Sequence, residues 1–128
     1  MSRPRLIAFD DEPDICELVS ESAEQVGFEA VSASDFATFT AHLSGGPADV
    51  IVLDLQIPGV DGIEVMRHLG SKECKASIII LSGVDERTLA AAERVGRTYG
   101  LRIHGRFRKP FLVREFQAEL RSLRQKIP

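Results

Sequence analysis

Short apolar runs, separated by stretches that mix apolar and polar residues, divide the chain into alternating strands and helices. Three of these runs are apolar at every position: Leu6–Phe9, Val50–Leu53 and Ile78–Leu81. Uniformly apolar runs of this length are typical of strands buried on both faces of a parallel sheet. Residues 29–33 and 103–107 mix apolar and polar side chains, so they are predicted to be edge strands.

The segments between these strands carry apolar residues at helical spacing. Proline suits the first position of a helix, so a helix is predicted to begin at Pro13 and to end before Gly27. Ser34 is predicted to cap a second helix, the third follows Gly62, and Asp85 is predicted to cap the fourth. The inward faces of the last three helices are expected to carry Ile63, Met66, Leu69, Leu89, Ala92, Tyr99, Leu112, Phe116, Leu120 and Leu123.

This alternation predicts an α/β fold, a three-layer doubly wound (βα)5 sandwich of the flavodoxin-like kind. Its parallel five-stranded sheet is expected in the order 2-1-3-4-5, which buries the three apolar strands and leaves the mixed strands at the edges. The functional crevice should lie beyond the carboxyl ends of strands one and three, where the strand order reverses. Residues 1–124 are expected to form one domain, and residues 125–128 a tail or the start of a linker.

Charged and hydroxyl side chains follow the ends of the predicted strands. Asp10 and Asp11 follow strand one, Asp54 follows strand three, Ser82 follows strand four and Lys109 follows strand five. Parallel strands end at the same edge of a sheet, so these groups are expected to converge there. Lys109 also precedes a proline, and its bond to Pro110 is a candidate cis peptide in a constrained turn.

Carboxylates gathered in this way repel one another unless one is protonated or a hard cation binds. Mg²⁺, with Mn²⁺ as an alternative, would accept Asp11, Asp54, a backbone carbonyl and waters, while Asp10 orients a coordinated water. Asp54 could then attack a phosphoryl group and form an aspartyl phosphate. Lys109, together with the Ser82 hydroxyl or a backbone N–H, would balance charge on the phosphoryl oxygens.

Composition narrows the classes of partner. A net charge of -3 argues against direct nucleic-acid binding, which needs a basic surface. No stretch approaches the roughly 18 apolar residues of a membrane span and no signal peptide is recognised, so a cytoplasmic location without membrane contact is expected. Cys16 and Cys74 have no paired spacing, so neither a disulfide nor a metal role is expected for them.

Four motifs, taken together and in order, resemble the receiver domain of two-component response regulators (CheY-like) over essentially the full chain. They are Phe9–Glu12, Asp54–Gly62, Leu81–Gly83 and Lys109–Phe111. The resemblance implies the following site. The phosphoacceptor is Asp54; the metal pocket is formed by Asp10, Asp11, Asp54 and the Gln56 main-chain carbonyl; the phosphate-binding and switch residues are Ser82, Gly83 and Lys109.

The same resemblance implies a phosphorelay function rather than turnover of a substrate. A sensor histidine kinase or a phosphotransfer protein would supply the phosphoryl group, with self-catalysed phosphorylation and dephosphorylation. The surface of helix four, strand five and helix five would then control a linked or separate output domain, or a phosphorylation-dependent homodimer. Residues 100–111 resemble, more narrowly, receivers joined to EAL-type cyclic-di-GMP phosphodiesterase domains.

One position departs from the receiver pattern. Receivers that resemble this chain usually place Tyr or Phe three residues before the lysine, whereas this chain has Arg106 there. The neighbouring Phe107 should point to the opposite face of the strand. We therefore treat Arg106 as a candidate switch element that moves between solvent and an acidic contact.

Three other functions remain open from the residues alone. An aspartate-nucleophile phosphatase would share the chemistry, but such enzymes usually carry a second acid at the position of Gln56. A flavodoxin-type nucleotide module would need a Ser/Thr/Gly-rich loop after strand one, where this chain has acids. A receiver-like interaction module that is never phosphorylated would not need Lys109 together with the acids.

Overall fold

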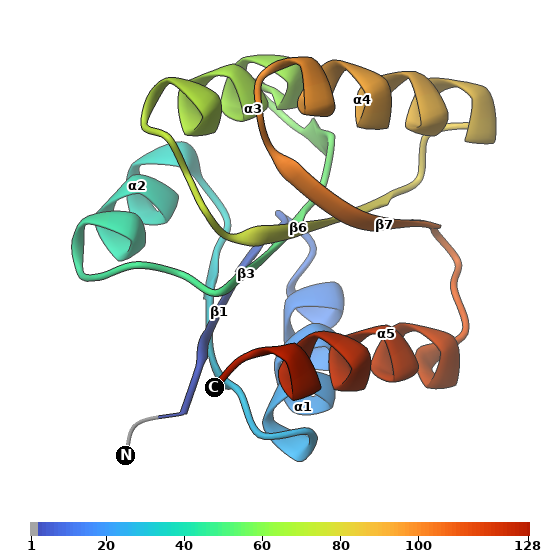
Figure 1. The fold of residues 1–128 in the computed structure, drawn as a ribbon. Helices are drawn as coiled ribbons and strands as arrows, with labels where there is room; N and C mark the ends of the chain where they lie inside the picture. Colours follow the sequence, from blue (N-terminus) through green and yellow to red (C-terminus); the bar gives the residue numbers. More distant parts are fainter. Residues whose placement is uncertain (1–2) are drawn as a thin grey trace.

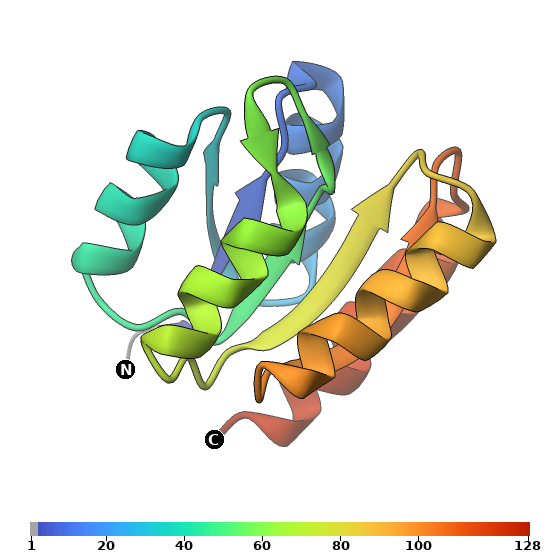
Figure 2. The same cartoon turned by 90° about the horizontal axis from the view of Figure 1, so that it is seen from above.

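A five-stranded parallel sheet forms the middle layer of the molecule, whose computed structural model describes residues 3–128. The strands run in the order β2-β1-β3-β6-β7, which is the predicted order 2-1-3-4-5 when the sheet strands are numbered along the chain. Figure 2 shows their carboxyl ends at the edge opposite the two chain termini. The strand bounds are β1 Arg5–Phe9, β2 Glu29–Ala33, β3 Val50–Leu53, β6 Ser77–Ser82 and β7 Arg102–Arg108.

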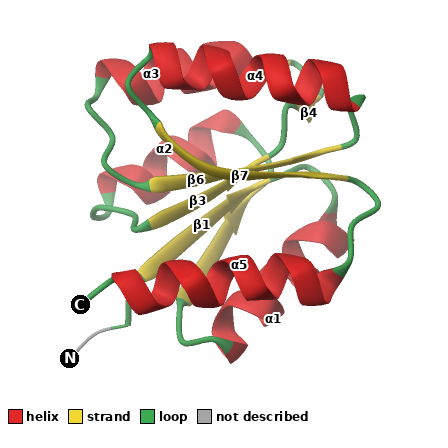
Figure 3. Cartoon of the chain, turned by 45° about the vertical axis from the view of Figure 1, so that its right-hand side comes forward, coloured by secondary structure: helices red, strands yellow, loops and turns green. Residues whose placement is uncertain are grey.

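Helices cover both faces of this sheet, so the predicted three-layer doubly wound fold is confirmed (Figures 1 and 3). On one face lie α1 Pro13–Gln25 and α5 Val113–Lys126. On the other lie α2 Phe36–Ser44, α3 Gly62–Ser71 and α4 Glu86–Thr98. Among residues 3–128, no helix is both long enough and apolar enough to cross a membrane.

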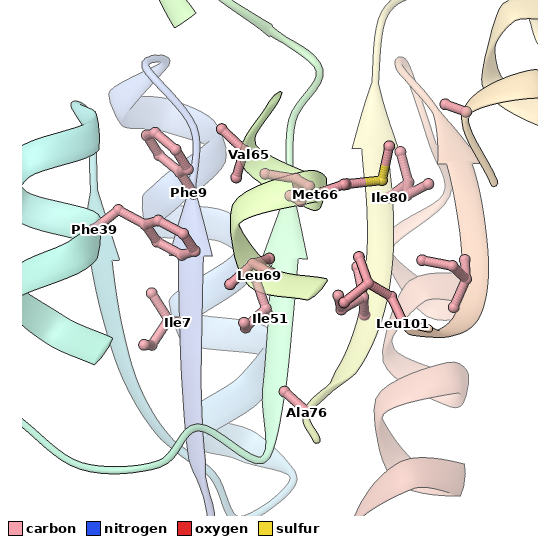
Figure 4. Close-up of a cluster of buried hydrophobic side chains, with 14 of the residues drawn as sticks. Ile7, Phe9, Phe39, Ile51, Val65, Met66, Leu69, Ala76, Ile80 and Leu101 are labelled. Carbon is pink, nitrogen blue, oxygen red and sulfur yellow. The ribbon is translucent and has the colours of Figure 1, made fainter. Parts of the chain in front are cut away.

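Successive side chains of the buried strands point to opposite faces of the sheet, and this alternation divides the core into two layers. In β1, Ile7 and Phe9 join the cluster beneath α2, α3 and α4, while Leu6 and Ala8 join the cluster beneath α1 and α5. Figure 4 shows the first cluster, in which the rings of Phe9 and Phe39 stack with centroids 4.5 Å apart. Because β1 is buried on both faces, it lies inside the sheet, between β2 and β3.

Three local features differ from the sequence-based expectations. The cap of α2 is Asp35 rather than Ser34, because the helix begins at Phe36 and the Asp35 carboxylate accepts the Thr38 N–H at 2.7 Å. Leu112 is 54% exposed because it precedes the first turn of α5 instead of lying on its inward face. An unexpected antiparallel hairpin, β4 Gln56–Ile57 and β5 Val60–Asp61, connects β3 to α3.

Other expectations about the elements are confirmed. Asp85 caps α4 by accepting the Thr88 N–H at 2.7 Å. The bond between Lys109 and Pro110 is cis. The end of the chain differs, because the last helix continues to Lys126, so residues 125 and 126, expected in a tail, are helical.

Candidate functional site

Adjacent strands bring two acids side by side at the carboxyl edge of the sheet. Phe9 at the end of β1 pairs with Leu53 at the end of β3, so the residues that follow them, Asp10 and Asp54, lie next to each other. Both carboxylates are almost fully buried, with residue exposures of 4% and 3%. Burial of two acids at one sheet edge is unfavourable unless a cation lies between them.

The ammonium of Lys109 supplies this positive charge. Its Nζ lies 2.8 Å from Asp10 Oδ2 and 3.3 Å from Asp54 Oδ2, and it donates to Glu12 Oε1 at 3.1 Å. The backbone N–H of Lys109 donates to the Ser82 carbonyl at 2.8 Å, which anchors this lysine to the end of β6. One side chain from beyond β7 therefore connects the acids that follow β1 and β3.

The second oxygen of each buried acid accepts a backbone N–H. Asp10 Oδ1 accepts from Glu12 at 2.9 Å, and Asp54 Oδ1 accepts from Gln56 at 3.0 Å. Because each of these donors lies two residues after its acid, the local turn fixes the carboxylate, and its Oδ2 faces the centre of the site. The acids are thus oriented before any ligand arrives.

Burial and neighbouring charges shift two pKa values in the site. Desolvation raises the pKa of Asp10 above its ordinary value and outweighs the hydrogen bonds from Lys109 and Glu12, which lower it. Burial alone would lower the pKa of Lys109, but hydrogen bonds to Asp10 and Glu12 and the charges of Asp10 and Asp54 raise it above its ordinary value. Lys109 is therefore a permanent cation at neutral pH.

The end of β6 contributes a buried hydroxyl. Ser82 is fully buried, and its Oγ has no hydrogen-bond partner among the described residues. A buried hydroxyl without an acceptor is unfavourable, so this group would gain from an added oxygen acceptor. Beside it, a Cβ on Gly83 would lie 3.1 Å from Gln56 Oε1, so a side chain here would crowd the Gln56 amide.

Carboxylate oxygens of Asp10, Glu12 and Asp54 lie within 4.8 Å of one another and form the group, among residues 3–128, that could hold a metal ion. Oxygen donors of this kind suit a hard divalent cation such as Mg²⁺. Asp11, the ligand expected from the sequence, lies outside this group, so its role as a ligand stays a prediction. Sequence reasoning did not propose Glu12, although the run of three acids contains it.

The remaining candidate, Arg106, lies on the opposite face of β7 from Phe107. Phe107 packs in the cluster beneath α1 and α5, with its ring 5.6 Å from that of Phe116. Arg106 instead forms ion pairs with Glu86 and Glu93 on α4. The predicted opposite orientation is confirmed, and Arg106 lies outside the acidic cluster.

A family model described as the response regulator receiver domain matches residues 6–121. Among curated proteins, VirG of Agrobacterium tumefaciens is 31% identical over 118 residues, which cover 91% of this chain and 42% of VirG. The alkaline phosphatase synthesis regulator PhoP of Bacillus subtilis is 28% identical, over 93% of this chain and 48% of PhoP. The chain thus spans about half the length of the curated relatives it matches.

Solved structures show the same similarity in three dimensions. A response regulator from Colwellia psychrerythraea is 31% identical and superposes with a TM-score of 0.80, covering 98% of this chain and all of its own. The Francisella response regulator 1452 receiver domain superposes with a TM-score of 0.81 over 96% of this chain and 98% of its own. At 23% identity, this second similarity concerns the fold alone.

Proposed function

The chain belongs to the response regulator receiver domain family, and from this membership we propose that Asp54 accepts a phosphoryl group in a two-component phosphorelay. The observation that carries the proposal is the contact of Lys109 Nζ with both Asp54 Oδ2 and Asp10 Oδ2, at 3.3 and 2.8 Å. It places a fixed ammonium beside one oriented carboxylate at the predicted crevice. Such an arrangement serves phosphoryl transfer, in which a protein mainly positions groups and balances charge.

In the proposed reaction, an Asp54 oxygen forms a bond to phosphorus while the bond from phosphorus to the donor atom breaks and its electron pair leaves with the donor. Lys109 would move its ammonium from the carboxylate to a phosphoryl oxygen, since both acceptors are negative. The Ser82 hydroxyl, which lacks a partner among the described residues, would donate to a second phosphoryl oxygen. Asp10 would keep its ion pair with the Lys109 ammonium during this movement.

The oxygen donors at this edge fit Mg²⁺, or Mn²⁺ in its place. Asp10, Asp11, Asp54 and the Gln56 main-chain carbonyl would hold it, and Asp10 and Asp54 of this set already lie together in the structure. When bound, the cation would supply charge neutralisation at the phosphoryl oxygens. Here it would reduce the repulsion between the Asp54 carboxylate and the negatively charged donor.

Histidine kinases and output domains are the partners of this family. For this chain we propose a sensor histidine kinase or a phosphotransfer protein as donor, in the cytoplasm. Residues 1–124 would form the receiver module, and residues 125–128, of which 125 and 126 still belong to α5, would lead toward an output region. Residues 100–111 resemble receivers joined to EAL-type phosphodiesterase domains, so such a domain is the output domain we would test first. A phosphorylation-dependent homodimer is a second proposal, which a measurement of the oligomeric state with and without phosphoramidate would test.

Incubation with phosphoramidate and Mg²⁺, followed by intact mass measurement, tests the proposed function. We expect wild-type protein to gain one phosphoryl group and Asp54→Asn to gain none. Glu64→Gln, which alters an exposed carboxylate on α3, serves as the control and should be phosphorylated like wild type. No gain by wild type, or equal gain by Asp54→Asn, would refute the proposal.

A phosphatase with an aspartate nucleophile is the second function to separate, since its first chemical step is the same. A phosphoacceptor domain consumes about one donor molecule per chain and then hydrolyses its own acyl phosphate slowly. A phosphatase would release phosphate continuously from many phosphate esters. Measured release over many turnovers would favour the enzyme; a single burst supports the receiver.

A further inference from the structure

The guanidinium of Arg106 connects β7 to two carboxylates on α4. Its Nε donates to Glu86 Oε1 at 2.9 Å, and its Nη1 lies 3.1 Å from Glu93 Oε2. Arg97 also contacts Glu93 Oε2, at 2.7 Å, and donates to the Ile103 carbonyl at 3.1 Å. These contacts form an ion-pair clamp, defined here as Arg106, Glu86, Glu93 and Arg97, between one helix and one strand.

The two carboxylates of the clamp differ in their access to water. The side chain of Glu93 is 13% exposed and pairs with two guanidinium groups, whereas that of Glu86 is 61% exposed and, among the described residues, forms an ion pair with Arg106 alone. An exposed ion pair is weak and is screened by salt, while a less exposed pair is screened less. The Arg106–Glu93 pair is therefore the stronger arm of the clamp, where an arm is one of the two ion pairs of Arg106. The Arg106–Glu86 pair is the weaker arm and the one that can open.

The weaker arm lies next to the phosphorylation site along the chain. Glu86 is the first residue of α4, and only residues 83–85 separate it from Ser82 at the end of β6. Arg106 pairs with Ile80 across the sheet and lies three residues before Lys109. The short segment 83–85 thus runs from the sheet to the first turn of α4, and Arg106 is paired to that first turn through Glu86.

Phosphorylation would change the forces on this segment. Ser82 Oγ is buried without a partner among the described residues, and oxygens of a phosphoryl group on Asp54 would be acceptors at the same sheet edge. Movement of the hydroxyl toward them shifts the start of segment 83–85. Because the segment is short, such a shift is opposed by whatever holds Glu86 in place.

Resting on the proposed phosphorylation of Asp54, we propose that Arg106 is a positioning residue that sets the readiness of Ser82 to bind the phosphoryl group. Through Glu86 it holds segment 83–85 in its present arrangement, and through Glu93 it stays attached to α4. When Asp54 is phosphorylated, the Arg106–Glu86 ion pair opens into solvent while the Arg106–Glu93 pair persists. An ion pair thus opposes the movement of Ser82.

The rate of phosphorylation by phosphoramidate, measured with saturating Mg²⁺, tests this inference. Loss of the weak arm should make phosphorylation faster, so we expect Glu86→Gln to raise the rate about two- to fivefold, the range of one exposed ion pair. Arg106→Gln should have a similar effect. The double variant should be no faster than either single variant, because both changes remove the Arg106–Glu86 pair. The Arg106–Glu93 pair, which Arg106→Gln also removes, persists on phosphorylation in this proposal and so should not change the rate.

The dependence of the rate on salt separates this positioning role from a purely structural role of Glu86, which would leave the ratio of variant to wild-type rates independent of salt. The ratio of the Glu86→Gln rate to the wild-type rate should fall toward one as KCl is added, because salt weakens the same ion pair in wild type. The matched control is Glu64→Gln, which removes the exposed Arg67–Glu64 pair on α3, where the glutamate is 60% exposed. Its rate should equal that of wild type at every salt concentration.

Two negative results have different meanings. If wild type is phosphorylated at Asp54 but Glu86→Gln behaves like Glu64→Gln, the clamp has no positioning role and this inference is wrong. If wild type takes up no phosphoryl group, the proposed function itself fails, and the inference fails with it. If the fold increases in rate of Glu86→Gln and Arg106→Gln multiply in the double variant, the two changes act independently. This result would also contradict the inference.

Discussion

At the scale of single residues, the site is defined by one cation facing three acids. If Asp10, Glu12 and Asp54 are all ionised, the Lys109 ammonium leaves the cluster with excess negative charge. Burial is the main cause of the raised pKa of Asp10, and the charge of Asp54 adds a smaller increase. The ionised form of Asp10 therefore lowers the stability of the folded state, and a divalent cation would relieve the remaining repulsion.

Replacing Asp10 with asparagine should stabilise the protein when divalent ions are removed with a chelator. We expect the free energy of unfolding at pH 7 to rise by about 0.5–2 kcal/mol, the usual size of a single stabilising substitution. Asparagine keeps an acceptor for Lys109 and removes the desolvated charge. Urea unfolding of Asp10→Asn beside wild type measures this change, and a loss of stability would contradict it.

The same substitution has a defined pH dependence. The pKa of Asp10 is raised in the folded state above its ordinary value, so the folded state binds the proton more tightly, and wild type loses stability as the pH rises between the unfolded and the folded pKa. The advantage of Asp10→Asn should therefore be absent below the unfolded pKa and fully developed above the folded one. An advantage that grows toward acid pH would contradict this sign.

At the scale of elements, close helix packing depends on glycine. A Cβ on Gly70, near the end of α3, would lie 2.6 Å from the Tyr99 carbonyl oxygen, which belongs to the backbone after α4. Backbone cannot move aside as a flexible side chain can. Gly70 therefore permits the approach between the ends of these two helices.

Gly70→Ala should lower the free energy of unfolding by about 1–3 kcal/mol, the usual penalty for added volume in a packed position. Gly45→Ala is the matched control, because Gly45 has a helical φ of -75° and its nearest neighbour would lie 3.4 Å from the new Cβ. Chemical denaturation of both variants measures the difference. Equal stability of the two variants would contradict this account of the helix contact.

At the scale of the whole molecule, the sheet order and the convergence at its carboxyl edge could be predicted because strands one, three and four are apolar at every position. The hairpin β4–β5 could not, since strands of two residues have no measurable periodicity. The place of Glu12 in the cluster also escaped prediction. It depends on the position of the ammonium of Lys109, a residue distant in sequence that donates to the Glu12 carboxylate.

Mg²⁺ should raise the free energy of unfolding, since the acids that would bind it come together only in the folded state. At ten times its dissociation constant it should add about 1.4 kcal/mol to the free energy of unfolding. We expect Asp54→Asn and Asp11→Asn to lose most of this gain, and Glu12→Gln to keep most of it. Thermal unfolding with and without Mg²⁺ measures the effect, and loss confined to Glu12→Gln would assign the ligand to Glu12.

The central claim is that Asp54, and no other acid of this edge, carries the phosphoryl group. Borohydride reduces an acyl phosphate to an alcohol and leaves free carboxylates unchanged, so it converts a phosphorylated aspartate into homoserine. After phosphoramidate treatment, borohydride reduction and peptide sequencing by mass spectrometry, we predict homoserine in place of Asp54 alone. Homoserine in place of Asp10 or Asp11, or none anywhere in the chain, would contradict the account.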